Sequence, residues 1–325
     1  SFSPTGQNSI VAPHFVLYIL NRLETTYGPN ALMSGLKVTT TLDADLETKA
    51  ESIVNRYALE NVKKFKATNA SLIAIDPSTG QILAMVGSRD FFDPAIDGQY
   101  NATLALRQPG STMKPFIYSL ALMRGYTRNT VIFDTPTQFS TFCSPSDIRN
   151  NIPPSYAPSD YDDTFRGPMT FETALAQSIN IPAIKVLYLV GIQNAINLAK
   201  SFGLTTLGDP SQYGLTLVLG GGEVRLLDLT GAYATFANDG IKNTPTGILE
   251  VSNAQGVVLE RYTPQPTEVV PMNIARDMSA ILSDAPARVP EYSLHSLLSF
   301  PGYDVAVKTG TTDNTRDAWT IGYTP

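Results

Sequence analysis

The segment Pro109-Gly110-Ser111-Thr112-Met113-Lys114-Pro115 carries a serine and a lysine three residues apart. On a helix, positions i and i+3 share a face, so the Lys114 ammonium group can lie beside the Ser111 hydroxyl. Pro115 has no backbone N–H and is tolerated only near a helix start, which places Ser111 at or next to a helix N-terminus. The N–H of Ser111 is then free to stabilise an oxyanion on a carbonyl that the serine attacks.

The same pattern also fits a serine that caps a helix and a lysine that points into solvent. A Ser-x-x-Lys sequence arises by chance about once in a chain of this length, and Ser34-Gly35-Leu36-Lys37 is a second example. The motif alone therefore does not identify a catalytic serine.

A second motif, Ser178-Ile179-Asn180, lies at the end of one predicted helix and just before Pro182. A hydroxyl there can relay a proton, and an amide can hold a substrate carbonyl or orient a lysine. A Ser/Asn turn between two helices fits the same residues at least as well.

A third motif, Lys308-Thr309-Gly310-Thr311-Thr312, ends an apolar strand. Lys-Thr-Gly should occur by chance only about 0.04 times in such a chain, which makes it the sharpest of the three. A lysine and hydroxyls at a strand edge suit a carboxylate, and Gly310 lets a backbone approach closely. The alternative is a polar strand end with a glycine turn.

Hydrophobic periodicity predicts a mixed protein of helices and strands with an accessory segment at residues 1–68 and a main body at 69–325. In the accessory segment we expect a helix near 15–26, a strand at 36–42 and a helix at 44–64. In the body we expect hairpins at 72–86 and 248–262, a long loop at 139–158, last strands at 303–309 and 317–323, and helices at 115–124, 170–178, 181–190, 192–201, 226–238 and 273–282. Strands at both ends with helices between them suggest that the terminal strands share one sheet.

Composition restricts the partners. The formal charge of −6 and the pI near 5.0 leave no basic surplus for nucleic acid. Cys143, His14 and His295 are the only thiol and imidazoles, so they cannot build a common zinc site, and we expect no metal or other cofactor, although a carboxylate-only site stays open. The sequence contains no run of 18 apolar residues and no signal-peptide pattern.

The three motifs, in this order, are the set found in penicillin-binding proteins and class A β-lactamases. The chain resembles class A, bifunctional penicillin-binding proteins over nearly its whole length. The resembling segments are Arg107-Gln108-Pro109-Gly110, 161–180 (YDDTFRGPMTFETALAQSIN), 219–240 (LGGGEVRLLDLTGAYATFANDG), 308–325 (KTGTTDNTRDAWTIGYTP), 12–16 (APHFV) and 36–43 (LKVTTTLD).

The resemblance implies an α+β fold of the penicillin-binding-protein and serine β-lactamase type, in which an antiparallel sheet from both ends of the domain accompanies an all-helical subdomain. It implies a serine D,D-transpeptidase that cross-links peptidoglycan stem peptides, with Ser111 as nucleophile, Lys114 as base and Ser178 as proton relay. The N–H groups of Ser111 and Thr311 would form the oxyanion hole. The implied substrate-binding residues are Asn180, Lys308, Thr309, Gly310 and Thr311.

The implied partners are stem peptides ending in D-Ala-D-Ala and β-lactam antibiotics, with no nucleic acid and an oligomeric state left open. The implied location is the extracytoplasmic face of a bacterial membrane, reached through an N-terminal anchor outside this sequence. Class A proteins also carry an N-terminal glycosyltransferase domain, and a further strand and a closing helix after 317–323. We therefore expect a fragment whose transpeptidase domain lacks its last strand and helix.

Three alternatives remain. A class A β-lactamase needs a Glu-x-x-Leu-Asn loop after the Ser-x-Asn motif, whereas Glu223-Val224-Arg225-Leu226 is followed by Leu227. A penicillin sensor or wall-anchoring scaffold would keep the motifs without turnover. A Ser-His-Asp site would have to use His14 or His295, and the chain has no Gly-x-Ser-x-Gly elbow.

Overall fold

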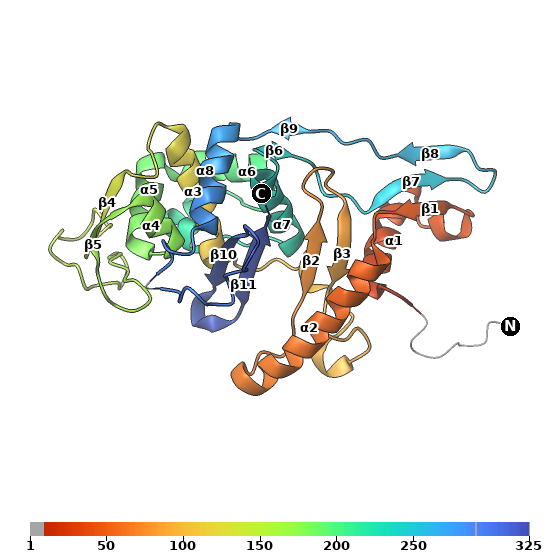
Figure 1. Ribbon diagram of the computed structural model, residues 1–325, viewed down its shortest axis with the longest axis horizontal. Coiled ribbons are helices and arrows are strands. Elements are labelled where there is room, and N and C mark those ends of the chain that lie inside the picture. Colours follow the sequence, from red (N-terminus) through yellow and green to blue (C-terminus); the bar gives the residue numbers. More distant parts are fainter. Residues whose placement is uncertain (1–9, 290, 325) are drawn as a thin grey trace. The chain divides into compact units, whose positions relative to one another are not determined.

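The computed structural model describes residues 10–289 and 291–324. The chain divides into two compact units, each assembled from segments that are distant in sequence. Unit 1 contains residues 10–106, Arg225–Ala234 and Lys242–Thr267, and unit 2 contains Arg107–Val224, Thr235–Ile241 and the described residues from Glu268 onward. Figure 1 colours the elements of both units along the chain.

Unit 1 combines small antiparallel sheets with two long helices. Its elements are α1 (Pro13–Tyr27), β1 (Lys37–Thr40), α2 (Ala44–Phe65), β2 (Leu72–Ile75), β3 (Ile82–Val86), β7 (Ile248–Ser252) and β8 (Val258–Arg261). Strand β1 pairs with β7 to give the order β1-β7-β8, and β2 pairs with β3. Helix α2 lies along the β2–β3 hairpin (Figure 1), because its apolar face packs Ala50 and Val54 against Ala84 and Val86.

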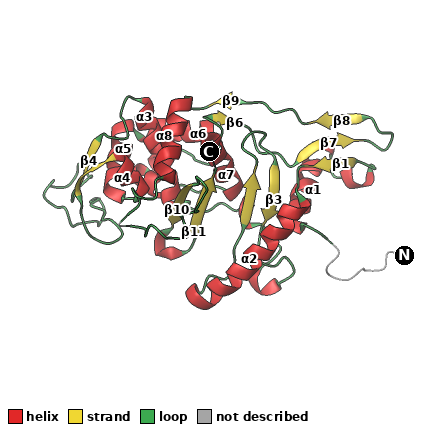
Figure 2. Cartoon of the chain, viewed as in Figure 1, coloured by secondary structure: helices red, strands yellow, loops and turns green. Residues whose placement is uncertain are grey.

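Unit 2 is mainly helical, with short strand pairs (Figure 2). A 3₁₀ turn (Gly110–Met113) runs directly into α3 (Lys114–Met123). The later elements are β4 (Val131–Asp134), β5 (Gly167–Thr170), α4 (Phe171–Ala176), α5 (Asn180–Val190), α6 (Ile192–Phe202), α8 (Met272–Ser283), β10 (Ala306–Thr311) and β11 (Ala318–Tyr323). Helix α7 (Leu226–Ala237) spans a boundary between the units along the chain.

An aromatic cluster fixes α3 in the core of unit 2. The rings of Phe116, Phe202 and Phe236 lie between 4.9 and 5.7 Å apart, centroid to centroid. Each of the three side chains is almost completely buried. Burial of such rings is among the larger stabilising contributions in a core, so the turn that precedes α3 starts from a rigid base.

The expected helices and hairpins are confirmed to within a few residues, and residues 139–158 form a loop without a regular helix or strand. The mixed fold with antiparallel pairs is also confirmed. Strand β2 pairs with β3 in unit 1, and β10 pairs with β11 in unit 2, so the first and the last strands of the expected body form two antiparallel pairs.

The remaining elements are short. They are the strands β6 (Ile241–Lys242) and β9 (Thr267–Glu268), which pair with each other, and the 3₁₀ turns Ala31–Met33, Pro94–Ile96, Ala102–Leu104, Pro210–Gln212, Gly214–Leu219 and Asp313–Thr315. Within the described residues, no single helix has the length and apolar composition to cross a membrane, and only the bent pair α5 and α6 passes when both helices are counted together.

Candidate active site

Ser111 and Lys114 lie three residues apart in one tight turn and its C-cap. Ser111 is the second residue of the 3₁₀ turn, and the N–H of Lys114 donates a hydrogen bond to its carbonyl oxygen. Pro115 follows as one of the first residues of α3, as its missing N–H predicts. Ser111 is partly exposed whereas Lys114 is fully buried, so the turn offers a hydroxyl to the surface above a buried amine.

Backbone contacts without room for a side chain hold this turn. A Cβ added to Gly110 would lie 2.6 Å from the Thr311 carbonyl oxygen, and one added to Gly310 would lie 2.3 Å from the Pro109 carbonyl oxygen. On another side of the turn, a Cβ added to Gly220 would lie 2.2 Å from the Gly110 nitrogen. The residues that flank Ser111 are therefore packed backbone to backbone against β10 and against the Gly220 turn.

The Lys114 amine reaches the Ser-x-Asn motif. Its Nζ donates to the Ser178 carbonyl oxygen at 2.5 Å and to Asn180 Oδ1 at 2.8 Å, and it lies 3.4 Å from Ser178 Oγ. Burial, and next the nearby positive charge of Lys308, hold the pKa of Lys114 well below its ordinary value. A lysine in this position is much closer to its neutral, basic form than an exposed one.

Lys308 approaches the same serine hydroxyl from β10. Its Nζ donates to Ser178 Oγ at 2.7 Å and to the Thr309 carbonyl oxygen at 2.9 Å. Burial lowers the pKa of Lys308 to about 7, against an opposing effect of the Glu291 carboxylate. Ser178 itself has φ of 61°, a left-handed conformation that is unusual for a non-glycine residue and often marks functional sites.

The structure thus brings together residues from all three motifs. The Ser178 hydroxyl lies between the amines of Lys114 and Lys308, and Thr311 contacts the residue before Ser111. The Thr309 hydroxyl hydrogen-bonds the Tyr292 hydroxyl at 2.8 Å, while Thr311 is exposed. In the described part of the chain, the Ser111 hydroxyl makes no hydrogen bond that meets ordinary distance and angle limits.

Several supporting residues escaped the sequence analysis. Asp160 accepts hydrogen bonds from the N–H groups of Asn180 and Ile181, at 2.7 and 3.2 Å. Gln177 Nε2 donates to the carbonyl oxygens of Ala287 and Val289, which ties the segment before Tyr292 to the end of α4. A buried carboxyl group in a loop or a buried amide at a helix end has no periodic signal in the sequence, so the sequence pattern points to neither residue.

Two of the competing positions, Ser34 and His14, hydrogen-bond backbone carbonyl oxygens. Ser34 follows a 3₁₀ turn and its hydroxyl donates to the Ala31 carbonyl oxygen at 2.5 Å, while Lys37 is exposed on β1. His14 is buried and its Nε2 hydrogen-bonds the Gly98 carbonyl oxygen at 3.0 Å. Burial lowers the pKa of His14. His295 is exposed in a turn.

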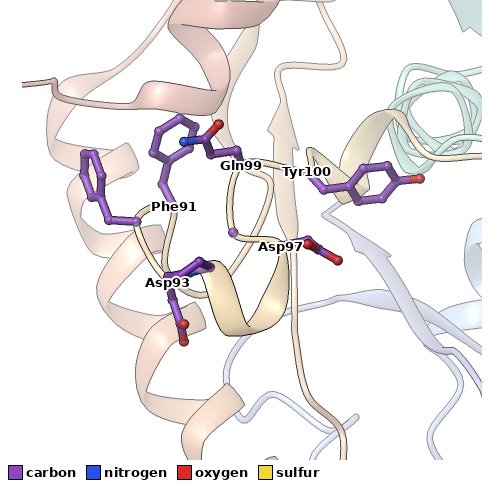
Figure 3. Close-up of a pocket in the computed structure, with 8 residues that line it drawn as sticks. Phe91, Asp93, Asp97, Gln99 and Tyr100 are labelled. Atoms are coloured by element: carbon purple, nitrogen blue, oxygen red, sulfur yellow. The ribbon is translucent and has the colours of Figure 1, made fainter.

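A hollow of about 260 Å³ lies elsewhere, in the loop of unit 1 from Phe91 to Tyr100. Figure 3 shows Asp93 and Gln99 pointing to opposite sides of this loop, and Asp97 and Tyr100 pointing away from both. The polar groups do not converge on one point, as a binding site requires. Among residues 10–289 and 291–324, no three His, Cys, Asp or Glu side chains are placed to hold a metal ion.

Comparison with known proteins decides the family. The model of the penicillin-binding protein transpeptidase domain matches residues 70–325. The chain belongs to this transpeptidase family. It is 30% identical to penicillin-binding protein 1A of Rickettsia bellii over 93% of its length, 37% identical to that of Aquifex aeolicus over 78%, and 32% identical to penicillin-binding protein 2D of Bacillus subtilis over 97%. It spans 38%, 32% and 44% of these relatives, less than half of each.

Solved structures show the same penicillin-binding protein fold. The chain aligns over 98% of its length with penicillin-binding protein 1A from Haemophilus influenzae, with a TM-score of 0.80 and 19% identity, and covers 66% of that chain. It aligns over 97% of its length with PonA1 from Mycobacterium tuberculosis, with a TM-score of 0.77 and 23% identity, and covers 81% of it. A second PonA1 structure, in complex with penicillin V, aligns over 97% of this chain with a TM-score of 0.71 and 22% identity, and 80% of it is covered.

Proposed function

We propose that this penicillin-binding protein domain is a serine D,D-transpeptidase, which cross-links peptidoglycan stem peptides through an acyl-enzyme on Ser111. One observation carries the proposal: a serine hydroxyl, that of Ser178, lies between two buried lysine amines beside the turn that presents Ser111. A nucleophile, a base of lowered pKa and a hydroxyl relay are the parts that acyl transfer requires. Family membership supports the same reaction class.

In the first half of the reaction, Ser111 Oγ attacks the carbonyl carbon of the penultimate D-alanine while the neutral amine of Lys114 takes the hydroxyl proton. The N–H groups of Ser111 and Thr311 stabilise the tetrahedral oxyanion. Its collapse breaks the peptide bond and expels the terminal D-alanine, whose amine receives a proton through the Ser178 hydroxyl. The lowered pKa of Lys114 supports its role, because only the neutral amine can accept a proton.

In the second half, an amine from another stem peptide attacks the ester on Ser111. An amide bond forms, the ester bond breaks, and the proton of the amine returns to Ser111 through Lys114. Lys308, Thr309 and Thr311 bind the terminal carboxylate of the donor, Gly310 leaves room for its backbone, and Asn180 holds a substrate carbonyl. The placement of Lys308 and the two threonines on one strand, β10, supports this assignment.

The partners that follow are stem peptides ending in D-Ala-D-Ala and β-lactams, which acylate the same serine. A domain that acts on peptidoglycan works on the extracytoplasmic face of the bacterial membrane. We assign this activity to residues 69–325 and an accessory role to residues 1–68.

A product assay tests the proposal. The chain is incubated with a β-lactam, and separately with a stem-peptide donor and an amine acceptor, and the products are followed by mass spectrometry. A persistent drug adduct together with an amide product and free D-alanine supports a transpeptidase. Rapid drug hydrolysis would instead indicate a β-lactamase, and an adduct without amide product would indicate a sensor; either result contradicts the proposal.

A further inference from the structure

Two buried carboxyl groups lie behind the Ser-x-Asn motif in unit 2. Asp134 ends β4 and is completely buried, and Asp160, in the loop that follows, is 2% exposed. Asp134 interacts electrostatically with Asp160, and each of the two side chains keeps one buried oxygen without a hydrogen-bond partner among the described residues. Because both carboxyl groups are buried, their hydrogen-bond partners have to come from other groups of the protein.

A hydrogen bond between the two carboxyl groups requires that one of them carries a proton. Asp134 Oδ1 and Asp160 Oδ2 are buried, and within the described residues neither receives a hydrogen bond from an amide, hydroxyl or amine. Two ionised carboxylates are acceptors only, so they can hydrogen-bond each other only when one of them is protonated. One shared proton would satisfy both oxygens and leave the pair with a single negative charge.

The other oxygen of Asp160 fixes the start of α5. Its Oδ1 accepts the N–H groups of Asn180 and Ile181, two donors that the first turn of a helix leaves unsatisfied. The Asn180 side chain is further held through its Nδ2, which donates to the Ser159 carbonyl oxygen at 3.3 Å. Asn180 Oδ1 then faces Lys114 Nζ at 2.8 Å. The carboxyl pair is thus two contacts away from the proposed base.

Several charged or titratable groups surround the pair. The backbone N–H of Arg166 donates to Asp134 Oδ2 at 2.7 Å, and its guanidinium lies 3.7 Å from that oxygen. Lys185, from α5, donates to the Phe133 carbonyl oxygen and the Thr135 hydroxyl and interacts electrostatically with both carboxylates. From α3, the Tyr118 hydroxyl and the Lys114 amine also interact electrostatically with Asp160.

We propose that Asp160, sharing a proton with Asp134, is a positioning residue for the reaction at Ser111, and that loss of the shared proton slows acylation. This rests on the proposed function. Below neutral pH the protonated pair holds Asn180 against Lys114. When the proton leaves, two negative charges face each other and the added charge favours the protonated, non-basic form of Lys114.

The pH range follows from the pair. Burial is the largest cause that raises the pKa of Asp160 to about 7, and the Asp134 carboxylate adds to it. Because the folded protein binds this proton more tightly than the unfolded chain, the pair's contribution to stability is complete below the unfolded pKa near 3.9 and is lost as pH rises through about 7.

Asp160→Asn tests the proposal. The amide oxygen still accepts from both N–H groups, and the amide NH2 group can donate to Asp134 at any pH, so no titratable proton is needed. We expect this variant to acylate with a fluorescent penicillin within about threefold of the parent at pH 6, and its acylation rate to reach its half-maximal value at a lower pH. Asp160→Ala should acylate roughly tenfold or more slowly, because two buried N–H groups lose their acceptor. Asp228→Asn, which removes a half-buried carboxyl group of raised pKa in unit 1, should follow the parent profile.

Thermal unfolding provides a readout that does not depend on acylation. Between pH 5.5 and 8.5 the parent should lose stability relative to Asp160→Asn. Three results would overturn the proposal. The parent and Asp160→Asn could show the same dependence of acylation on pH, Asp160→Asn and Asp160→Ala could be slowed equally, or the melting temperatures of the parent and Asp160→Asn could differ by the same amount at every pH in this range. If no variant forms an adduct on Ser111, the proposed function fails, and the unfolding comparison still decides whether the pair shares a proton.

Discussion

The Lys308 amine donates a 2.7 Å hydrogen bond to Ser178 Oγ although 130 residues separate them in the chain. The Lys114 amine lies 3.4 Å from the same oxygen. The hydroxyl therefore connects the amine of Lys114, which follows the Ser111 turn, with the amine of Lys308 on β10. Such a connection lets a proton move between a base and a leaving group without bulk water.

Ser178→Ala should slow acylation by about 10² to 10⁴, the usual range for a lost proton-transfer group. Folding should be little changed, because alanine keeps the same Cβ at this left-handed position. The second-order rate with a fluorescent penicillin gives the measurement. Ser119→Ala is the matched control, since this buried hydroxyl donates only to the Phe116 carbonyl oxygen on α3. Equal rates for both variants would exclude Ser178 as a relay.

Lys114→Ala should lose almost as much acylation as Ser111→Ala, because a nucleophile without its base is nearly inactive. The double variant should be no slower than either single variant, as is typical of groups that act as a unit. Stopped-flow acylation rates of the three variants check this. Losses that add in free energy would show that Lys114 is not the base.

Gly220→Ala should displace the 3₁₀ turn Gly110–Met113 that carries Ser111, because the added Cβ would lie 2.2 Å from the Gly110 nitrogen. Gly125→Ala is the control: both glycines have φ near 90°, and nothing lies within 4 Å of a Cβ at Gly125. Both variants carry the backbone strain of roughly 1–2 kcal/mol, but only Gly220→Ala should also slow acylation of the folded protein. A similar acylation rate in both variants would mean that the Gly220 contact does not position Ser111.

Lys308→Met should remove a destabilising effect that depends on pH. Burial lowers the pKa of Lys308 to about 7, so between this pH and the unfolded value near 10.4 the unfolded chain binds one more proton. The stability of the parent should therefore fall, relative to the variant, by up to about 1.4 kcal/mol for each pH unit from 10 down to 7. Denaturant unfolding at pH 9.5 and 7 measures this difference. Lys200→Met, on the exposed face of α6, should show no such trend.

The sequence predicted the position of a motif best where the motif lies next to a recognisable helix or strand pattern. Pro115 placed Ser111 near a helix start, the helical patterns placed Ser178 and Asn180 between two helices, and an apolar run predicted the strand that carries Lys308. The family resemblance supplied their meeting point, which no local pattern contains. The long separation between Ser178 and Lys308 is closed by the packing of unit 2.

The roles of Asp160 and Gly220 could not be predicted from the sequence, for a different reason. Each acts through a backbone contact with a residue far along the chain, Asp160 with Asn180 and Gly220 with Gly110. An aspartate in a polar loop and a glycine in a run of glycines look the same whether or not such a contact exists. Strand pairing is also absent from local patterns, since strand patterns predict strands and leave their partners undetermined.

The most direct test of the account is to locate the covalent adduct. The protein is incubated with a β-lactam, digested, and mapped by tandem mass spectrometry, with Ser111→Ala and Ser34→Ala as matched variants of the two Ser-x-x-Lys sequences. The account predicts one drug mass, carried by Ser111, absent from Ser111→Ala and unchanged in Ser34→Ala. An adduct on Ser34 or on any other residue, or an adduct that persists in Ser111→Ala, would contradict it.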